Sequence, residues 1–155
     1  MTVIAWDGRT LACDSQGTEA DGTISAVEKI WSVDGETLIA AAGVVAEGLE
    51  MKRWYLDGAE PERFPTLPGY DKLDTVLVVV TAEAVRAYHQ IPYPVLYAVD
   101  DPHAWGGASQ IARTAMYLGK GAKRACEIAC ELSVRCGAPV VAHDLKGRAK
   151  RGRRA

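Results

Sequence analysis

The sequence predicts one α+β domain in which helices pack on the outer faces of antiparallel sheets. Two patterns support this fold class: Asp-Gly pairs separate strand-like segments in the first third of the chain, and helical patterns form separate blocks further on. The 155 residues, 48% of them apolar, suit a single domain and leave no room for a second one. We expect this domain to span residues 1–145, without internal repeats.

The N-terminal third is predicted to be an antiparallel meander. Asp7-Gly8, Asp21-Gly22 and Asp34-Gly35 readily supply the positive φ angles of tight hairpin turns. The expected strands cover residues 2–6, 10–15, 26–33 and 36–42, with a looser turn region over residues 17–23. Hairpins of this kind belong to antiparallel sheets rather than to βαβ units.

A helix is predicted over residues 45–56, directly after a strand, with Gly58 as its stop signal. Its expected apolar stripe consists of Val45, Leu49 and Leu56. A loop follows, marked by Pro61, Pro65, Pro68 and Gly69.

The second half is predicted to add strands over residues 75–81, 84–89 and 94–99, then two helices and a last strand over residues 139–143. Gly119 and Gly121 separate the two helices. The apolar face of the first helix is expected at Ile111, Ala115 and Leu118, and that of the second at Ala125, Ile128, Ala129 and Leu132.

Nothing in the composition indicates a membrane, metal or cofactor site. The longest apolar run, residues 76–80, is far shorter than the roughly 18 to 20 residues that span a bilayer. No basic segment precedes an apolar run at the start, so we expect a cytoplasmic protein without a secretory signal. The four cysteines form no C-x-x-C pair; Cys126 and Cys130 lie one helical turn apart, but two ligands without a third indicate core packing.

Residues 146–155 form a basic tail that holds six of the 18 Lys and Arg residues and no acid. The preceding body therefore has 12 basic and 20 acidic residues, a net charge of −8. A solvated, disordered end explains such a tail more simply than binding to nucleic acid or to an acidic partner.

Thr2 is the first residue that could carry chemistry. Removal of Met1 would leave a hydroxyl and a free α-amine on the same residue, and that amine, with a pKa of about 8, can accept the hydroxyl proton. The alternative is an ordinary strand residue near a chain end.

Lys29 is expected in a buried position because period-two alternation places it on the same face as Val27, Trp31 and Val33. A buried ammonium group needs a partner, and Asp14, at the end of the preceding strand, is a plausible counter-ion. Such a lysine would lower the cost of deprotonating Thr2. A structural ion pair or a snorkelling lysine is the alternative.

Two glycine segments precede predicted helices. Gly43 stands where a backbone N–H near a helix N-terminus can stabilise an oxyanion, and the residues from Gly106 to Ser109 offer the same possibility. Either segment could equally be a simple turn.

In this order along the chain, these segments resemble the proteasome β-subunit family, especially its small bacterial and phage members and the HslV-type peptidase. Residues 2–5 resemble the mature start of the family, residues 11–15 its acid motif, residues 28–30 its lysine strand and residues 40–43 its oxyanion segment. Residues 104–109 and 136–140 resemble its G-S-G segment and its final glycine-rich turn. The resemblance implies a four-layer αββα sandwich of the N-terminal-nucleophile hydrolases, and hydrolysis of peptide bonds.

The resemblance assigns roles to four residues. Thr2 would be nucleophile and base, Asp14 and Lys29 its tuning pair, and Gly43 an oxyanion donor. The serine of the family's G-S-G segment falls on Gly107, and its late aspartate falls on Ser133, with Cys136 nearby in place of a small hydroxyl residue. Ser109 could substitute only if its hydroxyl turns toward Thr2.

The same resemblance implies a homo-oligomer, a peptide or unfolded-protein substrate and an AAA+ ATPase partner. The departures at Gly107 and Ser133 leave open a catalytically impaired protein that serves in ring or shell assembly. A cysteine hydrolase using Cys136 and His143 is a weaker alternative, because Cys136 lacks any diagnostic motif.

Overall fold

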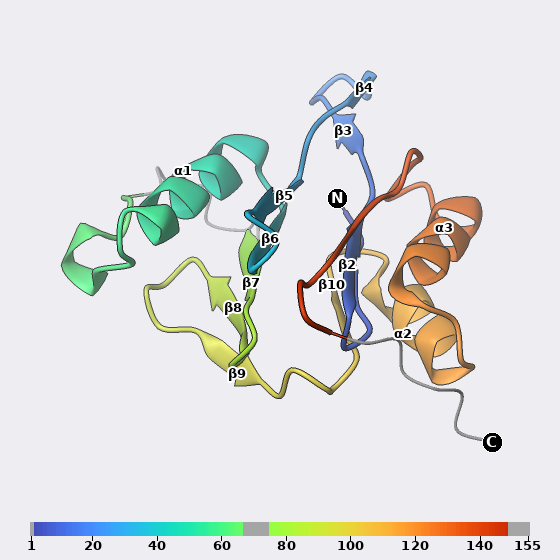
Figure 1. Cartoon of the computed structure of the whole chain (residues 1–155). Helices are drawn as coiled ribbons and strands as arrows, with labels where there is room; N and C mark the ends of the chain where they lie inside the picture. Colours follow the sequence, from blue (N-terminus) through green and yellow to red (C-terminus); the bar gives the residue numbers. More distant parts are fainter. Residues whose placement is uncertain (1, 67–74, 149–155) are drawn as a thin grey trace.

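The structure, a computed structural model, describes residues 2–66 and 75–148 (Figure 1). A four-stranded antiparallel sheet contains the N-terminal strand and has the order β10-β1-β2-β11. Its strands are β1 (Ile4–Trp6), β2 (Thr10–Cys13), β10 (His103–Trp105) and β11 (Val141–Asp144). The tight turn between β1 and β2 forms because the Asp7 carboxylate accepts the backbone N–H groups of Arg9 and Thr10 at 3.0 and 2.8 Å.

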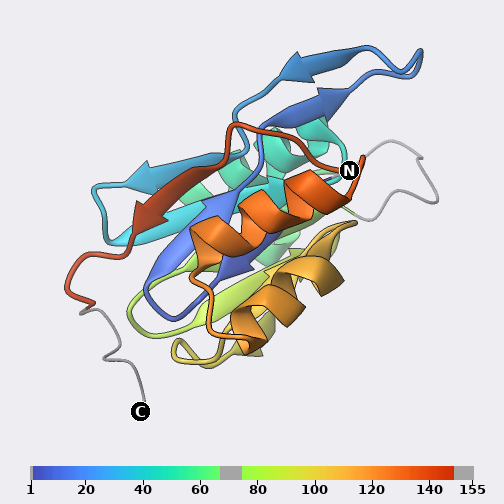
Figure 2. The ribbon, with the colours of Figure 1, turned by 90° about the vertical axis from the view of Figure 1, so that its right-hand side faces the viewer.

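A second antiparallel sheet has five strands in simple meander order. Its strands are β5 (Ile30–Val33), β6 (Thr37–Ala42), β7 (Val76–Val80), β8 (Val85–His89) and β9 (Val95–Tyr97). The short strands β3 (Gln16–Thr18) and β4 (Ile24–Ala26) form a separate hairpin, which Figure 2 shows extending beyond the two large sheets. The helical elements are α1 (Val45–Leu56), the 3₁₀ turn η1 (Pro61–Arg63), α2 (Ser109–Tyr117) and α3 (Ala122–Leu132).

Four layers result, and three hydrophobic cores separate them (Figure 1). The central core lies between the two sheets and contains Trp6 and Leu11 from one sheet and Val78 from the other. A second core joins the four-stranded sheet to α2 and α3, and a third joins the five-stranded sheet to α1. This arrangement confirms the expected α+β class and the αββα sandwich.

The strands expected in the first third occur in the predicted order, but they form no single meander, because β1 and β2 belong to the four-stranded sheet and β5 and β6 to the five-stranded sheet. Three further details of the strand prediction are wrong. The strand expected over residues 26–33 is interrupted: β4 ends at Ala26, β5 begins at Ile30, and Lys29 lies just before β5. The expected turn region over residues 17–23 contains parts of β3, because the Asp21-Gly22 turn closes a hairpin there. The strand β10 was not predicted, since its three residues show no alternation long enough to detect.

The bounds of α1 are as predicted, but its expected apolar stripe is wrong. Val45, Leu49 and Leu56 are exposed, and α1 instead packs through the opposite side of the helix. The buried residues are Glu47, Gly48, Met51 and Trp54. Gly48 explains the choice, because a Cβ atom there would lie 2.7 Å from the Ala41 Cβ atom, so the glycine lets the helix approach the sheet closely.

Small residues also decide how α2 and α3 pack. Their buried positions are Ala112, Ala115, Ala122, Ala125, Cys126 and Ala129. Leu118 and Leu132, both expected to be buried, are each 71% exposed. Alanine and cysteine allow a short distance between helix and sheet, which moves the larger side chains to the rim of the interface.

The chain beyond β11 starts along the body of the domain. Leu145 is buried, the Lys146 N–H donates to the Gly35 carbonyl oxygen at 2.8 Å, and Arg148 bonds the Gly8 carbonyl and pairs with Asp100. Residues 149–155, most of the expected tail, lie outside the described residues, as do Pro68 and Gly69 of the expected loop. No helix in the two described ranges is long and apolar enough to cross a membrane.

Candidate active site

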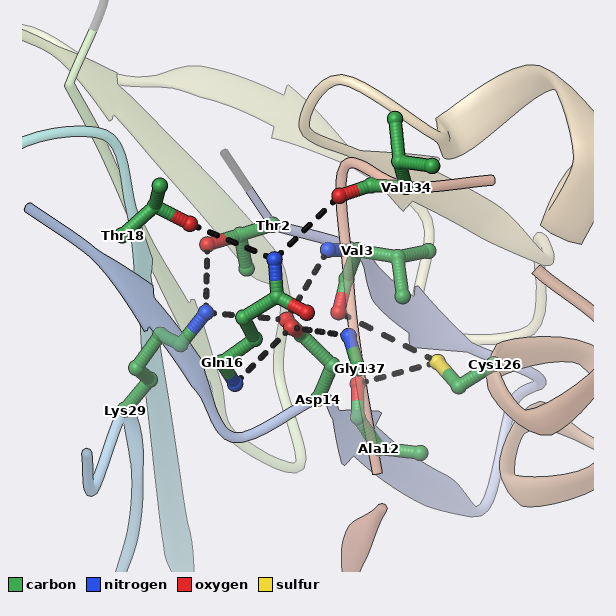
Figure 3. Close-up of polar contacts among 10 residues, drawn as sticks. All are labelled: Thr2, Val3, Ala12, Asp14, Gln16, Thr18, Lys29, Cys126, Val134 and Gly137. Atoms are coloured by element: carbon green, nitrogen blue, oxygen red, sulfur yellow. Dashed lines mark hydrogen bonds and ion pairs between the residues drawn. The ribbon is translucent and has the colours of Figure 1, made fainter. Parts of the chain in front are cut away.

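A cleft with a volume of about 580 Å³ lies beside the start of β1. Thr2, Lys29, Gly43 and Gly106 line it, together with Gly107 and residues of the β3–β4 hairpin. These segments lie far apart in the sequence, and the sandwich brings them to one place. The cleft therefore contains three of the four sequence-predicted site residues, and the fourth, Asp14, contacts Lys29 (Figure 3).

Asp14 is 1% exposed, and its carboxylate accepts four hydrogen bonds. Oδ1 accepts the Val3 N–H at 3.1 Å and the Lys29 ammonium group at 3.0 Å. Oδ2 accepts the N–H groups of Gln16 and Gly137, both at 3.1 Å. Hydrogen bonds to the charged form of a carboxylate favour that form, so this environment supports a buried anion.

Lys29 connects this carboxylate to Thr2. Its Nζ atom lies 2.8 Å from Thr2 Oγ1 and 3.0 Å from Asp14 Oδ1 (Figure 3). Thr2 is 2% exposed and Lys29 is 5% exposed, so the contact is largely shielded from water. An ammonium group that donates to a hydroxyl oxygen stabilises the alkoxide, which lowers the cost of removing the hydroxyl proton.

The backbone of Thr2 is held closely on its other side by the segment that precedes α2. The Ala108 N–H approaches the Thr2 carbonyl oxygen at 3.5 Å. Gly106 has φ +98°, and a Cβ atom there would lie 2.1 Å from the same oxygen. Only glycine fits at Gly106, so this residue fixes the distance between the N-terminal strand and the α2 segment.

Gly43 also requires glycine geometry, with φ +107° between β6 and α1. Gly43 lines the cleft together with Thr2. Gly107 lines the cleft as well, so the position expected to carry a serine hydroxyl has no side chain.

Among residues 2–66 and 75–148, hydrogen bonds do not connect the two accessory candidates to this cluster. Ser109 begins α2, and in the described part of the chain no hydrogen bond links its hydroxyl to Thr2. Ser133 follows α3, where its Oγ atom accepts the Arg135 N–H at 3.1 Å.

Gln16 and Gly137 were missed by sequence reasoning. Gln16 donates through Nε2 to Thr18 Oγ1 and to the Val134 carbonyl oxygen, each at 3.2 Å, so it ties the hairpin to the turn after α3 (Figure 3). The Asp14 to Gln16 bond is the short-range turn contact that aspartate favours, and it could have been expected from the sequence. Gly137 is 123 residues from Asp14, and no local pattern predicts that contact.

The cysteines form a separate buried group behind the site. Cys136 is hydrogen-bonded to Cys130, and burial raises the pKa of both thiols, that of Cys130 to about 12. In the described residues no interaction joins Cys136 to His143, which lies on β11 opposite Leu11. Raised thiol pKa values disfavour the thiolate that a cysteine hydrolase needs. Within residues 2–66 and 75–148, no group of three or more His, Cys, Asp or Glu side chains could hold a metal ion.

No protein-family model matches this sequence, and no curated protein matches it. Solved structures do match. The crystal structure of eukaryotic HslV from Trypanosoma brucei superimposes with a TM-score of 0.67 over 92% of this chain and 97% of that chain, at 16% sequence identity. This chain has the HslV fold.

Two further structures with this fold are those of Thiobacillus denitrificans BPH. One matches with a TM-score of 0.65 over 96% of this chain and 100% of that chain. The other, BPH in complex with epoxomicin, matches with a TM-score of 0.66 over 94% and 99%. Both are 18% identical to this chain. The HslV fold therefore extends over nearly the whole chain.

Proposed function

We propose that this chain is an N-terminal-threonine peptidase or amidase that becomes active when Met1 is removed. The contact that carries this proposal is the 2.8 Å hydrogen bond from Lys29 Nζ to Thr2 Oγ1, with the lysine charge balanced by Asp14. A buried ion pair that also bonds a hydroxyl group beside a cleft is suited to activating that hydroxyl.

In the proposed reaction, the free α-amine of Thr2 takes the hydroxyl proton while Lys29 stabilises the developing alkoxide. Thr2 Oγ1 attacks the carbonyl carbon of a bound peptide, and the Gly43 N–H stabilises the oxyanion. The protonated α-amine of Thr2 then gives this proton to the leaving amine as the C–N bond breaks, which leaves an ester on Thr2. Water, deprotonated by the same amine, hydrolyses the ester and restores the hydroxyl group.

The proposal includes a peptide or unfolded-protein substrate, a homo-oligomer, an AAA+ ATPase partner and a cytoplasmic location. The cleft is lined by extended segments on both sides, the β3–β4 hairpin and the end of β6, which suits an extended peptide. The missing hydroxyl at Gly107 suggests slow turnover, because no side chain there helps to orient the α-amine.

The test is hydrolysis of a mixed peptide library by the chain lacking Met1 and by three variants of it. Thr2→Ser keeps a hydroxyl group and should keep activity, whereas Thr2→Ala should abolish it. A matched exposed change, Thr114→Ala on α2, should leave turnover unaltered. Cleavage that survives Thr2→Ala would place the chemistry elsewhere.

A second candidate function is ring or shell assembly without catalysis. An apolar groove of about 520 Å³ between α2 and α3 favours it, because Leu118 and Leu132 line this groove and are exposed. Light scattering of the wild type and of Leu118→Glu measures this role. An oligomer that dissociates in Leu118→Glu, together with no peptide hydrolysis by the wild type, supports assembly; turnover that depends on Lys29 contradicts it.

A further inference from the structure

Glu47 is a buried carboxylate, 5% exposed, that the proposed reaction does not use directly. It occupies the third position of α1, whose N-cap residue is Val44. A glutamate at this position commonly reaches back to the N-cap N–H and closes a capping box. Glu47 reaches that N–H by a different route.

The hydroxyl group of Thr75 lies between the Val44 N–H and the Glu47 carboxylate. Val44 N–H donates to Thr75 Oγ1 at 3.1 Å, and Thr75 Oγ1 donates to Glu47 Oε2 at 2.6 Å. Gln90 Nε2 donates to the same carboxylate oxygen at 3.0 Å. Thr75 is fully buried, and the contact between its hydroxyl and Glu47 is buried. The oxygen of Thr75 therefore accepts from the N-cap and donates to the glutamate at once.

The sheet places Thr75 beside the cleft wall. Ala42, the last residue of β6, pairs with Val76, the first residue of β7, so Gly43 and Thr75 both lie just beyond this pair. Val44 cannot cap α1 with its own apolar side chain, and no side-chain cap is present at that residue. Thr75 and Glu47 thus supply the cap from the neighbouring strand and from within the helix.

We propose that Glu47, acting through Thr75, is a positioning residue that fixes the Gly43–Val44 turn against Thr2. The Val44 N–H belongs to the peptide unit that directly follows Gly43, so its hydrogen bond sets the orientation of that unit. A turn with φ +107° at Gly43 has several accessible orientations without such a restraint. The hydrogen-bonded chain of the Val44 N–H, the Thr75 hydroxyl and the Glu47 carboxylate, called the relay below, selects the orientation in which Gly43 faces the cleft. This inference rests on the proposed function, because Gly43 is there the oxyanion donor.

The test compares Thr75→Val, which removes the hydroxyl group at nearly constant shape, with Thr75→Ser, which keeps it. Thr75→Val should lower kcat by about 10- to 100-fold with little change in KM, because misplacing one oxyanion donor affects the transition state more than substrate binding. Affinity for a peptide boronate, whose adduct with Thr2 is tetrahedral, should fall by a similar factor. Thr75→Ser should recover most of both.

Glu47→Ala should behave like Thr75→Val, and Glu50→Ala is its matched control, since Glu50 lies exposed on the same helix. Equal losses of kcat and boronate affinity in Thr75→Val and Thr75→Ser would show that Thr75 acts through packing and not through its hydroxyl group, which would overturn the inference. Wild-type kcat and boronate affinity in Thr75→Val would overturn it as well.

A readout independent of activity separates this inference from the proposed function. Amide hydrogen exchange at Val44 should be about tenfold faster in Thr75→Val than in the wild type, because the N–H loses its acceptor. It should be unchanged in Thr75→Ser. If the wild type hydrolyses nothing, the proposed function fails, and faster exchange at Val44 still supports the relay. Unchanged exchange in Thr75→Val overturns the relay whatever the activity.

Discussion

Asp14 is the residue on which the other site residues depend. Its four hydrogen bonds connect Val3 beside Thr2, Lys29, the β3–β4 hairpin at Gln16 and the turn at Gly137. A carboxylate that accepts from four donors can stay charged without water. The same carboxylate forms an ion pair with the buried Lys29 side chain next to Thr2.

Asp14→Asn should therefore destabilise the fold strongly. An amide group in place of the carboxylate turns one acceptor into a donor that faces other donors, and it leaves the Lys29 charge buried without a counter-ion. We expect a loss of about 3 to 5 kcal/mol in the free energy of unfolding, measured in urea. Asp57→Asn, which removes an exposed ion pair with Arg53, should cost less than about 1 kcal/mol. Equal costs for the two variants would show that the carboxylate of Asp14 is not a buried anchor.

Gly106→Ala tests how closely the α2 segment holds Thr2. The new Cβ atom would lie 2.1 Å from the Thr2 carbonyl oxygen, so the N-terminal strand or the segment must move. Gly119→Ala is the matched control, since Gly119 has a similar φ of +90° and open space around it.

The control should cost about 1 to 2 kcal/mol, the strain of a left-handed alanine. Thermal or urea unfolding of Gly106→Ala should show a clearly larger loss. If both variants unfold alike, the close approach to Thr2 has no energetic weight.

Sequence patterns identified some of these residues and not others, for physical reasons. Alternation through Trp31 and Val33 predicted that Lys29 is buried, and a buried charge demands a partner such as Asp14. The contact of Gly137 with Asp14 depends on how the last turn crosses the sheet, which no local pattern encodes. The roles of Thr2, Asp14, Lys29 and Gly43 remain a proposal that the experiments above address.

At the scale of elements, α1 shows how glycine can override an apolar stripe. Its larger aliphatic residues face solvent because Gly48 lets the opposite side approach the five-stranded sheet. Periodicity alone cannot reveal this choice, since it depends on the shape of the surface against which the helix packs.

Met51→Ala and Leu49→Ala test which side of α1 is buried. Met51 is fully buried in the core beneath α1, so its truncation should lower the free energy of unfolding by about 2 to 5 kcal/mol. Leu49 is 45% exposed, and its truncation should have a much smaller effect. Urea unfolding measures both losses. A larger loss in Leu49→Ala than in Met51→Ala would support the apolar stripe expected from the sequence.

The contact between β9 and β10 through His103 predicts that the stability of the fold depends on pH. The His103 ring contacts Tyr97 and Trp105, and burial, followed by the nearby Arg113 charge, lowers the pKa of His103 in the folded chain. The unfolded state therefore binds the proton more tightly, so this contribution to stability is present above about pH 6.5 and is lost as pH falls.

His103→Phe keeps an aromatic ring and removes the titration. Its urea midpoint should fall less than that of the wild type between pH 7.5 and pH 5.5. Parallel curves for the two proteins would exclude a role for His103.

The whole molecule explains why the fold was easier to predict than the site. Strand and helix order follows from local turns and periodicity, and it indicated an α+β fold with helices outside antiparallel sheets. The four-layer αββα sandwich was implied by the resemblance to the proteasome β-subunit family. The cleft, in contrast, is assembled from the N-terminal strand, the residues before β5, the end of β6 and the segment before α2. The hairpin that completes its wall, β3–β4, had been expected only as a loose turn.

The proposed chemistry depends on a free amine and a hydroxyl group on the same residue, Thr2. The most direct measurement is the intact mass of the purified chain before and after incubation with a peptide epoxyketone, which reacts with both groups. We predict a chain that lacks Met1 and gains the mass of one inhibitor molecule, with no gain in Thr2→Ala. A chain that retains Met1 and takes up no inhibitor, or one that is labelled equally after Thr2→Ala, would contradict the proposed threonine chemistry.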